Sequence, residues 1–465
     1  MKKFFEKHDL IKISGIMVLV SVLLTWIIPY GYFSGSDIVI EDITRVGLTN
    51  FMQYGLLGLY YFTVLVTFLF VLGAFYQMLG KTAGYRKLIK DISDKFKGHE
   101  VLVSLIVSFV FAAVTSVSYE YLPIVVFIPF VVTVLSNIKV DKVSALAATF
   151  GSMLVGIIGS TYSTKIAGYI SSSLNTEVTS LLVVKIALFV LAFAFLNVFN
   201  IRRIKKVKKD AKQEYDMFAI ETFEKKTTAK SWPYIVLGVV MFVVTVLAYL
   251  PWSTWEVTLF DTVTKSVNEF TILGVPVLSY VLGNLLAFGA WDLFTIQFVM
   301  LFAILLIHWF GRVNLDETIE AFGNGFAKMA PTVVVLLFVY MILEFSVMYP
   351  VVPVIVDWFA TIAKGFNVVW NFIAAFITSL FSVEMQYAMN LAGSYYAANF
   401  AGSTEVMSLI FQTTFGLVSF FAPSSVILMI GLSYLKVPYK DWFKFIWKFL
   451  VAMLLVSIIL IIIVA

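Results

Sequence analysis

Apolar runs of about twenty residues or more recur along the chain, and this feature limits the fold more than any other. They include residues 13–33, 53–80, 178–200, 232–250 and 446–465. A helical run of this length matches the roughly 30 Å hydrocarbon core of a bilayer, whereas the strands of a membrane β-barrel are about half as long and alternate in polarity. The chain is therefore predicted to be an all-α polytopic membrane protein.

The composition and the placement of charge agree with this class. Hydrophobic residues make up 61% of the 465 positions and charged residues 13%, whereas about a quarter of a soluble domain is charged. Cytoplasmic loops retain lysine and arginine. The basic loops therefore predict a protein of the cytoplasmic membrane with its N-terminus on the cytoplasmic side and loops 34–52 and 251–270 on the outer side. Of the 33 basic residues, 28 lie in the six segments 1–12, 81–100, 137–142, 201–230, 310–330 and 436–448.

Two longer apolar runs cannot be single spans, because both ends of each run lie on the same side of the membrane. Residues 101–136 have cytoplasmic flanks and are interrupted at Glu120 and Pro123. Residues 367–400 have outer flanks and are interrupted near 382–386. Each run is predicted to be a re-entrant hairpin that enters and leaves on one side.

Two further runs contain polar breaks that interrupt a helix. Segment 143–173 is broken by GSTYSTK at 159–165, and segment 405–436 by APSS at 422–425. Non-helical backbone at membrane depth is tolerated only where it lines an enclosed or watery cavity. The two breaks therefore predict a substrate site formed by two discontinuous helices.

A hairpin, a discontinuous helix and a closing span occur in each half of the chain with opposite orientation. This is the pattern of an inverted-topology repeat. We predict a first membrane repeat at 1–200, a cytoplasmic basic linker at 201–231, and a second, inverted repeat at 232–465. The second repeat would also contain spans at 285–310 and 331–349.

Two polar segments have the periodicity of amphipathic helices. Residues 82–97 gather apolar side chains on one helical face opposite several lysines. Residues 315–329 do the same after Asn314, which is a good N-cap. Both are predicted to be helices in the cytoplasmic interface that brace the bundle.

Charged side chains within spans are costly and indicate a functional or structural need. Glu120 and Glu384 occupy equivalent hairpin breaks, so we expect them to contact a substrate or ion; the alternative is that each caps its own hairpin. Lys165 would contact an anionic group or pair with Glu120. The remaining acids are expected to be structural, and Lys185 to extend to the interface. The charged residues within the predicted spans, hairpins and breaks are Glu120, Lys165, Lys185, Asp292, Glu344 and Glu384.

Hydroxyl groups and free carbonyls at the helix breaks could replace water around a sodium ion, while half-helix N-termini attract anions. A sodium ion at Ser160, Thr161, Ser424 and Ser425 is the corresponding hypothesis. The alternative is that these hydroxyls only satisfy the broken hydrogen-bond ladder. The breaks also bring Gly159, Ser163, Thr164, Pro423 and, from the second hairpin, Gln386 into the candidate site.

Several classes of function are excluded. The chain has no cysteine, and its three histidines show no ligand spacing, so we expect neither a metal site nor a thiol nucleophile. The sequence Gly80-Lys81-Thr82 resembles the end of a phosphate loop, but Phe75 stands where that motif needs a glycine. We therefore predict no enzyme activity, no cofactor and no nucleic-acid partner.

Several motifs together resemble the YfcC/DcuC family of the ion transporter superfamily. They are TWIIPYGYF in the first span, the hairpin with Glu120, GST at 159–161, FQTTFGLVSFFAPSS at 411–425 and LKVPYKDW at 435–442. The resemblance covers nearly the whole chain. It implies a secondary carrier of organic ions, often a homodimer, and it brings Gln412 and Thr413 into the candidate site.

The sequence departs from the family pattern at the breaks. Relatives usually carry Asn-Pro after GST and before the second-half serines, where this chain has Tyr162-Ser163 and Ala422-Pro423. The first hairpin also carries one acid where relatives tend to carry two. These differences affect the coupling ion and the substrate more than the fold.

The charges within the spans suggest the sign of the substrate. Four acids oppose two lysines and no arginine, whereas a dianion would be better matched by an arginine fork. The sequence therefore favours a basic amino acid antiporter of arginine/ornithine type. A sodium- or proton-coupled C4-dicarboxylate transporter is the alternative, and a channel or membrane scaffold is an alternative of another class.

Overall fold

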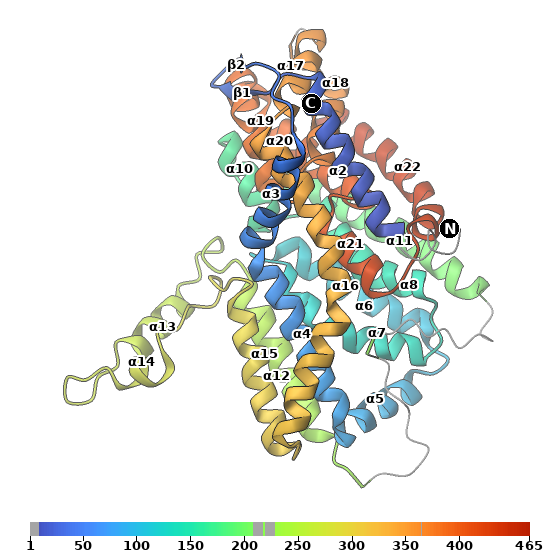
Figure 1. Cartoon of the computed structure of the whole chain (residues 1–465), viewed down its shortest axis with the longest axis vertical. Helices are drawn as coiled ribbons and strands as arrows, with labels where there is room; N and C mark the ends of the chain where they lie inside the picture. Colours follow the sequence, from blue (N-terminus) through green and yellow to red (C-terminus); the bar gives the residue numbers. More distant parts are fainter. Residues whose placement is uncertain (1–8, 208–216, 219–227, 364) are drawn as a thin grey trace.

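The protein is described here by a computed structural model that covers residues 9–207, 217–218, 228–363 and 365–465 (Figure 1). Over these residues it is helical, except for loops and the antiparallel strand pair β1 (Gly31–Ser34) and β2 (Asp37–Ile40). Seven of the described helices are long and apolar enough to cross a membrane. The predicted class, an all-α polytopic membrane protein, is confirmed.

In the first half of the chain, a hairpin turns at 118–121 and a helix is interrupted at 159–163. Both features lie within the runs 101–136 and 143–173, where the sequence predicts them. The helical elements, in order, are α2 (Asp9–Ile27), α3 (Leu48–Tyr61), α4 (Thr63–Lys81), α5 (Ala83–Phe96), α6 (Glu100–Val117), η1 (Leu122–Phe127), α7 (Ile128–Asn137), α8 (Lys142–Leu146), η2 (Ala147–Gly151), α9 (Ser152–Ile158), η3 (Thr164–Gly168), α10 (Tyr169–Leu174) and α11 (Leu182–Lys206).

The second half has the same two features in the same order. A hairpin turns at 381–384, and a helix is interrupted at 420–425. The helical elements are α12 (Trp232–Tyr249), α13 (Leu259–Asn268), α14 (Val277–Leu282), α15 (Thr295–Phe310), α16 (Leu315–Met348), α17 (Val352–Ala363), α18 (Val368–Leu380), α19 (Met385–Asn399), η4 (Ala401–Ser403), α20 (Thr404–Ser419), α21 (Val426–Tyr434) and α22 (Tyr439–Val464).

Two predicted spans have different bounds in the structure. The run 53–80 is divided between α3 and α4, which meet at Phe62, where the helical backbone is interrupted and the ring stacks on Tyr340. The run 285–310 becomes helical only at Thr295. Asp292 precedes that helix and its Oδ1 accepts a hydrogen bond from the Thr295 backbone at 2.8 Å, so it caps α15 and does not lie within a span.

The interfacial helix and the span predicted at 315–329 and 331–349 form one continuous helix, α16, so their separation was wrong. Pro331 removes only one backbone donor, and packing against α4 holds the helix together around it. Gly73 and Gly325 let the two helices touch, because a Cβ on Gly325 would lie 2.3 Å from a backbone nitrogen of α4.

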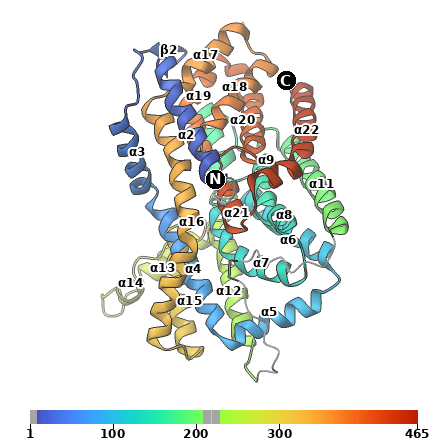
Figure 2. The same cartoon turned by 45° about the vertical axis from the view of Figure 1, so that its right-hand side comes forward.

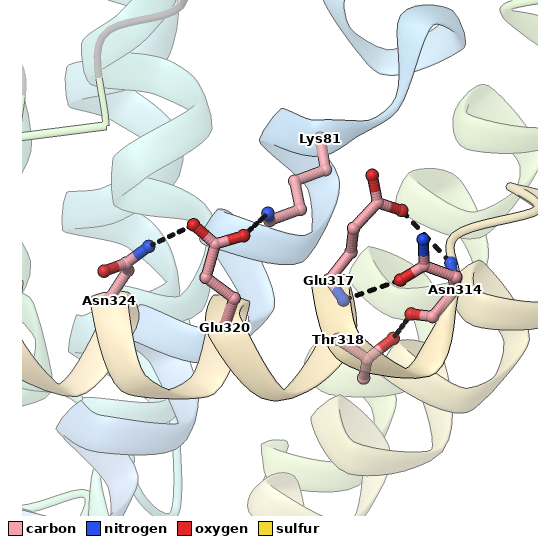
Figure 3. Close-up of polar contacts among 6 residues, drawn as sticks. All are labelled: Lys81, Asn314, Glu317, Thr318, Glu320 and Asn324. Atoms are coloured by element: carbon pink, nitrogen blue, oxygen red, sulfur yellow. Dashed lines mark hydrogen bonds and ion pairs between the residues drawn. The ribbon is translucent and has the colours of Figure 1, made fainter.

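The start of α16 is fixed by polar contacts (Figure 3). Asn314 is the predicted N-cap, and its side chain accepts from the Glu317 backbone at 2.7 Å while Glu317 accepts from the Asn314 backbone at 3.1 Å. One turn further, Glu320 forms an ion pair with Lys81 at the end of α4. The ion pair joins the start of α16 to the end of α4, and the same two helices pack against each other at Gly73 and Gly325.

Several helices gather at the two ends of the molecule. Figure 1 shows α5, α12 and α15 at one end, α17 and α18 with the strand pair at the other, and α13 and α14 projecting away from the body. Figure 2 shows α11 and α22 side by side.

The division into two repeats, the inside N-terminus and the homodimer stay predictions. Most of the predicted linker 201–231 lies outside the described residues.

Candidate functional site

The tip of the first hairpin holds a partly buried ion pair. Glu120 follows the end of α6, and one carboxylate oxygen accepts from the Leu122 backbone at 3.2 Å. The other oxygen lies 3.1 Å from Nζ of Lys165, just beyond the first helix break. Glu120 therefore both caps its own hairpin and pairs with Lys165, so two roles that the sequence treats as alternatives occur together.

The first break is held against the end of α6 by Ser116. Its hydroxyl donates to the Gly159 carbonyl at 2.6 Å, and its carbonyl accepts from the Thr161 backbone at 2.9 Å. Ser116 was not predicted from the sequence, because its partner Gly159 lies 43 residues away and no local pattern connects the two. Gly159 itself serves packing, because a Cβ there would lie 2.2 Å from Cβ of Phe189 on α11.

Gln412 on α20 joins the two discontinuous helices. Its amide nitrogen donates to the carbonyls of Ile158 at 3.0 Å and Ser160 at 2.9 Å, where the first helix stops. The orphan carbonyls of a helix end need such partners when they are buried. This residue, which the family resemblance indicates, therefore stabilises the non-helical backbone of the other half of the chain.

Four buried oxygens, two at this break and two on α20, have no hydrogen-bond partner among the described residues. They are the hydroxyls of Ser160, Ser163 and Thr413 and the side-chain oxygen of Gln412. Buried polar atoms are nearly always paired with protein, water or an ion. Neutral oxygens of this kind can take part in binding a cation, although this set shares only Ser160 with the predicted sodium ligands. Thr161 uses its hydroxyl on Ser116, and Thr164 is half-buried nearby.

The second break is stabilised by its own cap and by α22. The Ser425 hydroxyl accepts from the Leu428 backbone at 3.4 Å and caps α21. Trp442 donates to the Phe420 carbonyl at 2.8 Å, and Tyr439 donates to the Phe421 carbonyl at 2.5 Å. These two aromatic residues were missed as supports of the break. Pro423 and Ser424 directly precede the cap residue Ser425; Pro423 is half-buried and Ser424 is buried.

Both hairpin tips and both discontinuous helices border one small cavity. It is lined by Tyr121, Leu122, Ile157, Val383, Glu384, Phe415, Ser419, Ser425, Val426 and Ile427. Glu384 occupies the N-cap position of α19, at the second hairpin tip. The water-accessible volume is about 10 Å³, near the lower limit for one water molecule. The site is closed in this conformation and must open to admit a solute.

Other predicted residues lie outside this cavity. Gln386 is exposed on α19. Lys185 is only 1% exposed and donates to the Val178 carbonyl at 2.8 Å, so the prediction that it extends to the interface was wrong. The nearby carbonyl supplies the partner that water would otherwise have provided. Glu344 is buried within α16.

The charges at the cavity are unbalanced: Glu384 lines it, and the Glu120–Lys165 pair lies beside it. Lys165 interacts electrostatically with both Glu120 and Glu384, so two carboxylates share one ammonium group. The first turn of α21, at Val426 and Ile427, also borders the cavity, and helix N-termini favour anions. The site can therefore interact with solutes or ions of either sign.

A closed cavity between hairpin tips and discontinuous helices, within a bundle of membrane-spanning helices, defines a secondary carrier and not an enzyme. The order of the elements and the position of the breaks agree with that class. The chain belongs to the DcuC family, described as C4-dicarboxylate anaerobic carriers, whose family model matches residues 8–465. The resemblance seen in the sequence motifs is confirmed.

A solved structure, the YdaH transporter of Alcanivorax borkumensis, is similar to this chain at 12% sequence identity and a TM-score of 0.42. The alignment covers 97% of both chains. A search of curated proteins finds no match.

Proposed function

We propose that the protein carries C4-dicarboxylates across the cytoplasmic membrane together with cations. The family supports this substrate class. The family favours the C4-dicarboxylate transporter, which the sequence gives as the alternative, whereas nothing in the comparisons supports a basic amino acid antiporter. The observation that carries the proposal is the Lys165–Glu120 ion pair beside the closed cavity.

Lys165 supplies the charge that a dicarboxylate needs. Its ammonium group is occupied by Glu120 in the closed state, so a substrate carboxylate would bind by taking the place of that side chain. The second carboxylate would lie at the N-terminus of α21, whose first turn borders the cavity. A four-carbon chain between two carboxylates suits a site with two separate anion-attracting groups.

Charge balance explains why cations must accompany the substrate. Glu120, Glu384 and Lys165 together carry one net negative charge, and a dianion would raise this to three within a largely dehydrated site. Buried charge without compensation is costly. Protons on the two carboxylates, or sodium at the unpaired oxygens of Ser160 and Thr413, would offset it.

The experiment is uptake of labelled succinate into liposomes that contain the purified protein. Under the proposal, uptake saturates, is competed by fumarate and malate, and is unaffected by arginine, ornithine and lysine. Removing sodium and collapsing the proton gradient in separate arms identifies the coupling ion. Liposomes with the Glu120→Gln/Lys165→Met double variant serve as the matched control.

Two outcomes would reject the proposal. Arginine or ornithine counterflow without succinate uptake would restore the basic amino acid antiporter. Flux that rises linearly with concentration and shows no counterflow would indicate a channel.

A further inference from the structure

A second cavity, which shares no lining residue with the closed site, lies between the first hairpin and the helices α4, α5 and α12. Figure 2 shows α5, α7 and α12 together at this end of the molecule. The cavity volume is about 420 Å³, within the roughly 300–1,000 Å³ of pockets that hold small organic molecules. The space is therefore large enough for a substantial ligand.

The lining excludes the charged substrate. None of the described residues that line the cavity carries a charge, and almost all of the lining is aliphatic or aromatic. The hydroxyl of Tyr76, one of its few polar groups, is already used, because it donates to the Val126 carbonyl at 2.7 Å. A dianion would lose its hydration here without compensation, whereas a hydrocarbon chain would lose unfavourable contact with water.

The cavity opens sideways to the bilayer. Ile106 on α6 and Val239 on α12 line it and are 52% and 56% exposed on membrane-spanning helices. Phe111 and Met241 line it from the same two helices but are 3% and 4% exposed. The cavity thus leads from a lipid-facing mouth between α6 and α12 to buried residues, which a lipid on the outer surface of the protein would not contact.

A basic helix borders the same cavity. The apolar face of α5 contributes Tyr85, Leu88 and Ile92 to the lining. The segment 81–100 that contains α5 carries six basic residues against three acidic ones. Basic segments next to a membrane attract anionic lipid headgroups. Charge complementarity and an apolar interior therefore select the same kind of molecule.

We propose that this cavity binds one acyl chain of an anionic phospholipid, whose headgroup lies against α5. The chain fills the space between the first hairpin and α12. This binding site is independent of the carrier's substrate, and its failure would leave the proposed function untouched.

The test uses vesicles of phosphatidylglycerol in which a small fraction carries a photoreactive group on one acyl chain. After illumination, mass spectrometry locates the labelled residues. We expect labelling at the buried Phe111 and Met241, in addition to the general labelling of lipid-facing positions such as Val451 and Leu455 on α22. The same reactive chain on phosphatidylcholine should label the buried pair several-fold less.

Gly238 offers a variant that fills the cavity. It lines the cavity, and a Cβ there meets nothing within 4 Å. Gly238→Phe should lower labelling of Met241 by roughly tenfold, because the ring takes the space of several methylene groups. Gly323→Phe is the control, since Gly323 on α16 also has open space but does not line the cavity.

Labelling of α22 without labelling of the buried pair would overturn the proposal. So would equal labelling of the buried pair in Gly238→Phe and wild type. Equal labelling by the phosphatidylcholine probe would overturn the assignment to an anionic lipid.

Discussion

Replacing Lys165 by methionine removes the only ammonium group paired with Glu120 in the described structure. The two groups lie 3.1 Å apart, with side chains 27% and 8% exposed. At an effective dielectric constant of about 20, such charges attract each other by about 5 kcal/mol before desolvation is subtracted. Leaving the carboxylate buried alone would cost roughly 3–5 kcal/mol of stability.

The effect on substrate binding is separate from this loss of stability. A hydrogen bond to a charged group contributes about 1.5–3 kcal/mol, so losing the Lys165 contact should weaken succinate binding by about 10- to 150-fold. Glu120→Gln removes the competitor for the same ammonium group and should not weaken binding. The Glu120→Gln/Lys165→Met double variant removes both charges of the ion pair, so it should regain most of the lost stability without regaining affinity.

The assay is equilibrium binding of labelled succinate to purified protein, with thermal unfolding measured on the same samples. Lys185→Met is the control, because Lys185 is a buried lysine that binds a carbonyl away from the cavity. Wild-type affinity in the double variant would refute the role of Lys165. Loss of arginine binding in Glu120→Gln, with no succinate binding in wild type, would show that the site selects cations.

Three further predictions concern topology, the second hairpin and packing. Single cysteines in this cysteine-free chain, Lys95→Cys and Asp261→Cys, should react with an impermeant thiol reagent from the cytoplasmic and the outer side, respectively; reaction of both from the same side would reject the predicted topology and the inverted repeat. Glu384→Gln should reduce succinate transport at least about tenfold at unchanged expression, and normal transport would make this acid a structural cap. Gly325→Leu should prevent stable folding, because its Cβ would meet the α4 backbone at 2.3 Å, whereas Gly323→Leu should behave as wild type in thermal unfolding; equal stability would contradict the packing.

The elements with the strongest sequence signals were predictable. The hairpins follow from apolar runs that are too long for one span, and the helix breaks follow from polar residues that interrupt such runs. Glu120 and Lys165 are prominent because charged residues are rare within membrane-spanning segments. The junction at Phe62 was not predictable, since no proline or charged residue marks it, and the stacking of its ring on Tyr340 is a tertiary contact. The continuity of α16 through Pro331 depends in the same way on its contact with α4.

The supporting residues of the site were harder to predict than its charges. Ser116, Tyr439 and Trp442 bind carbonyls of breaks that are distant in sequence, so no local pattern connects them. The preference for a basic amino acid, which was predicted from the charges, is not supported by the family. Counting acids within spans included Asp292, which caps a helix, and ignored the helix N-terminus at the cavity.

The central claim is that a dicarboxylate binds in the cavity between the hairpin tips, and substrate protection of one cysteine tests it most directly. Ser419 lines the cavity, and the chain has no other thiol, so Ser419→Cys reports on this site alone. At succinate concentrations about ten times Kd, labelling of Ser419→Cys should slow about tenfold, because only the free carrier reacts. The exposed Ser172→Cys should be unaffected. Labelling of Ser419→Cys that succinate does not slow, or that arginine slows instead, would contradict the account.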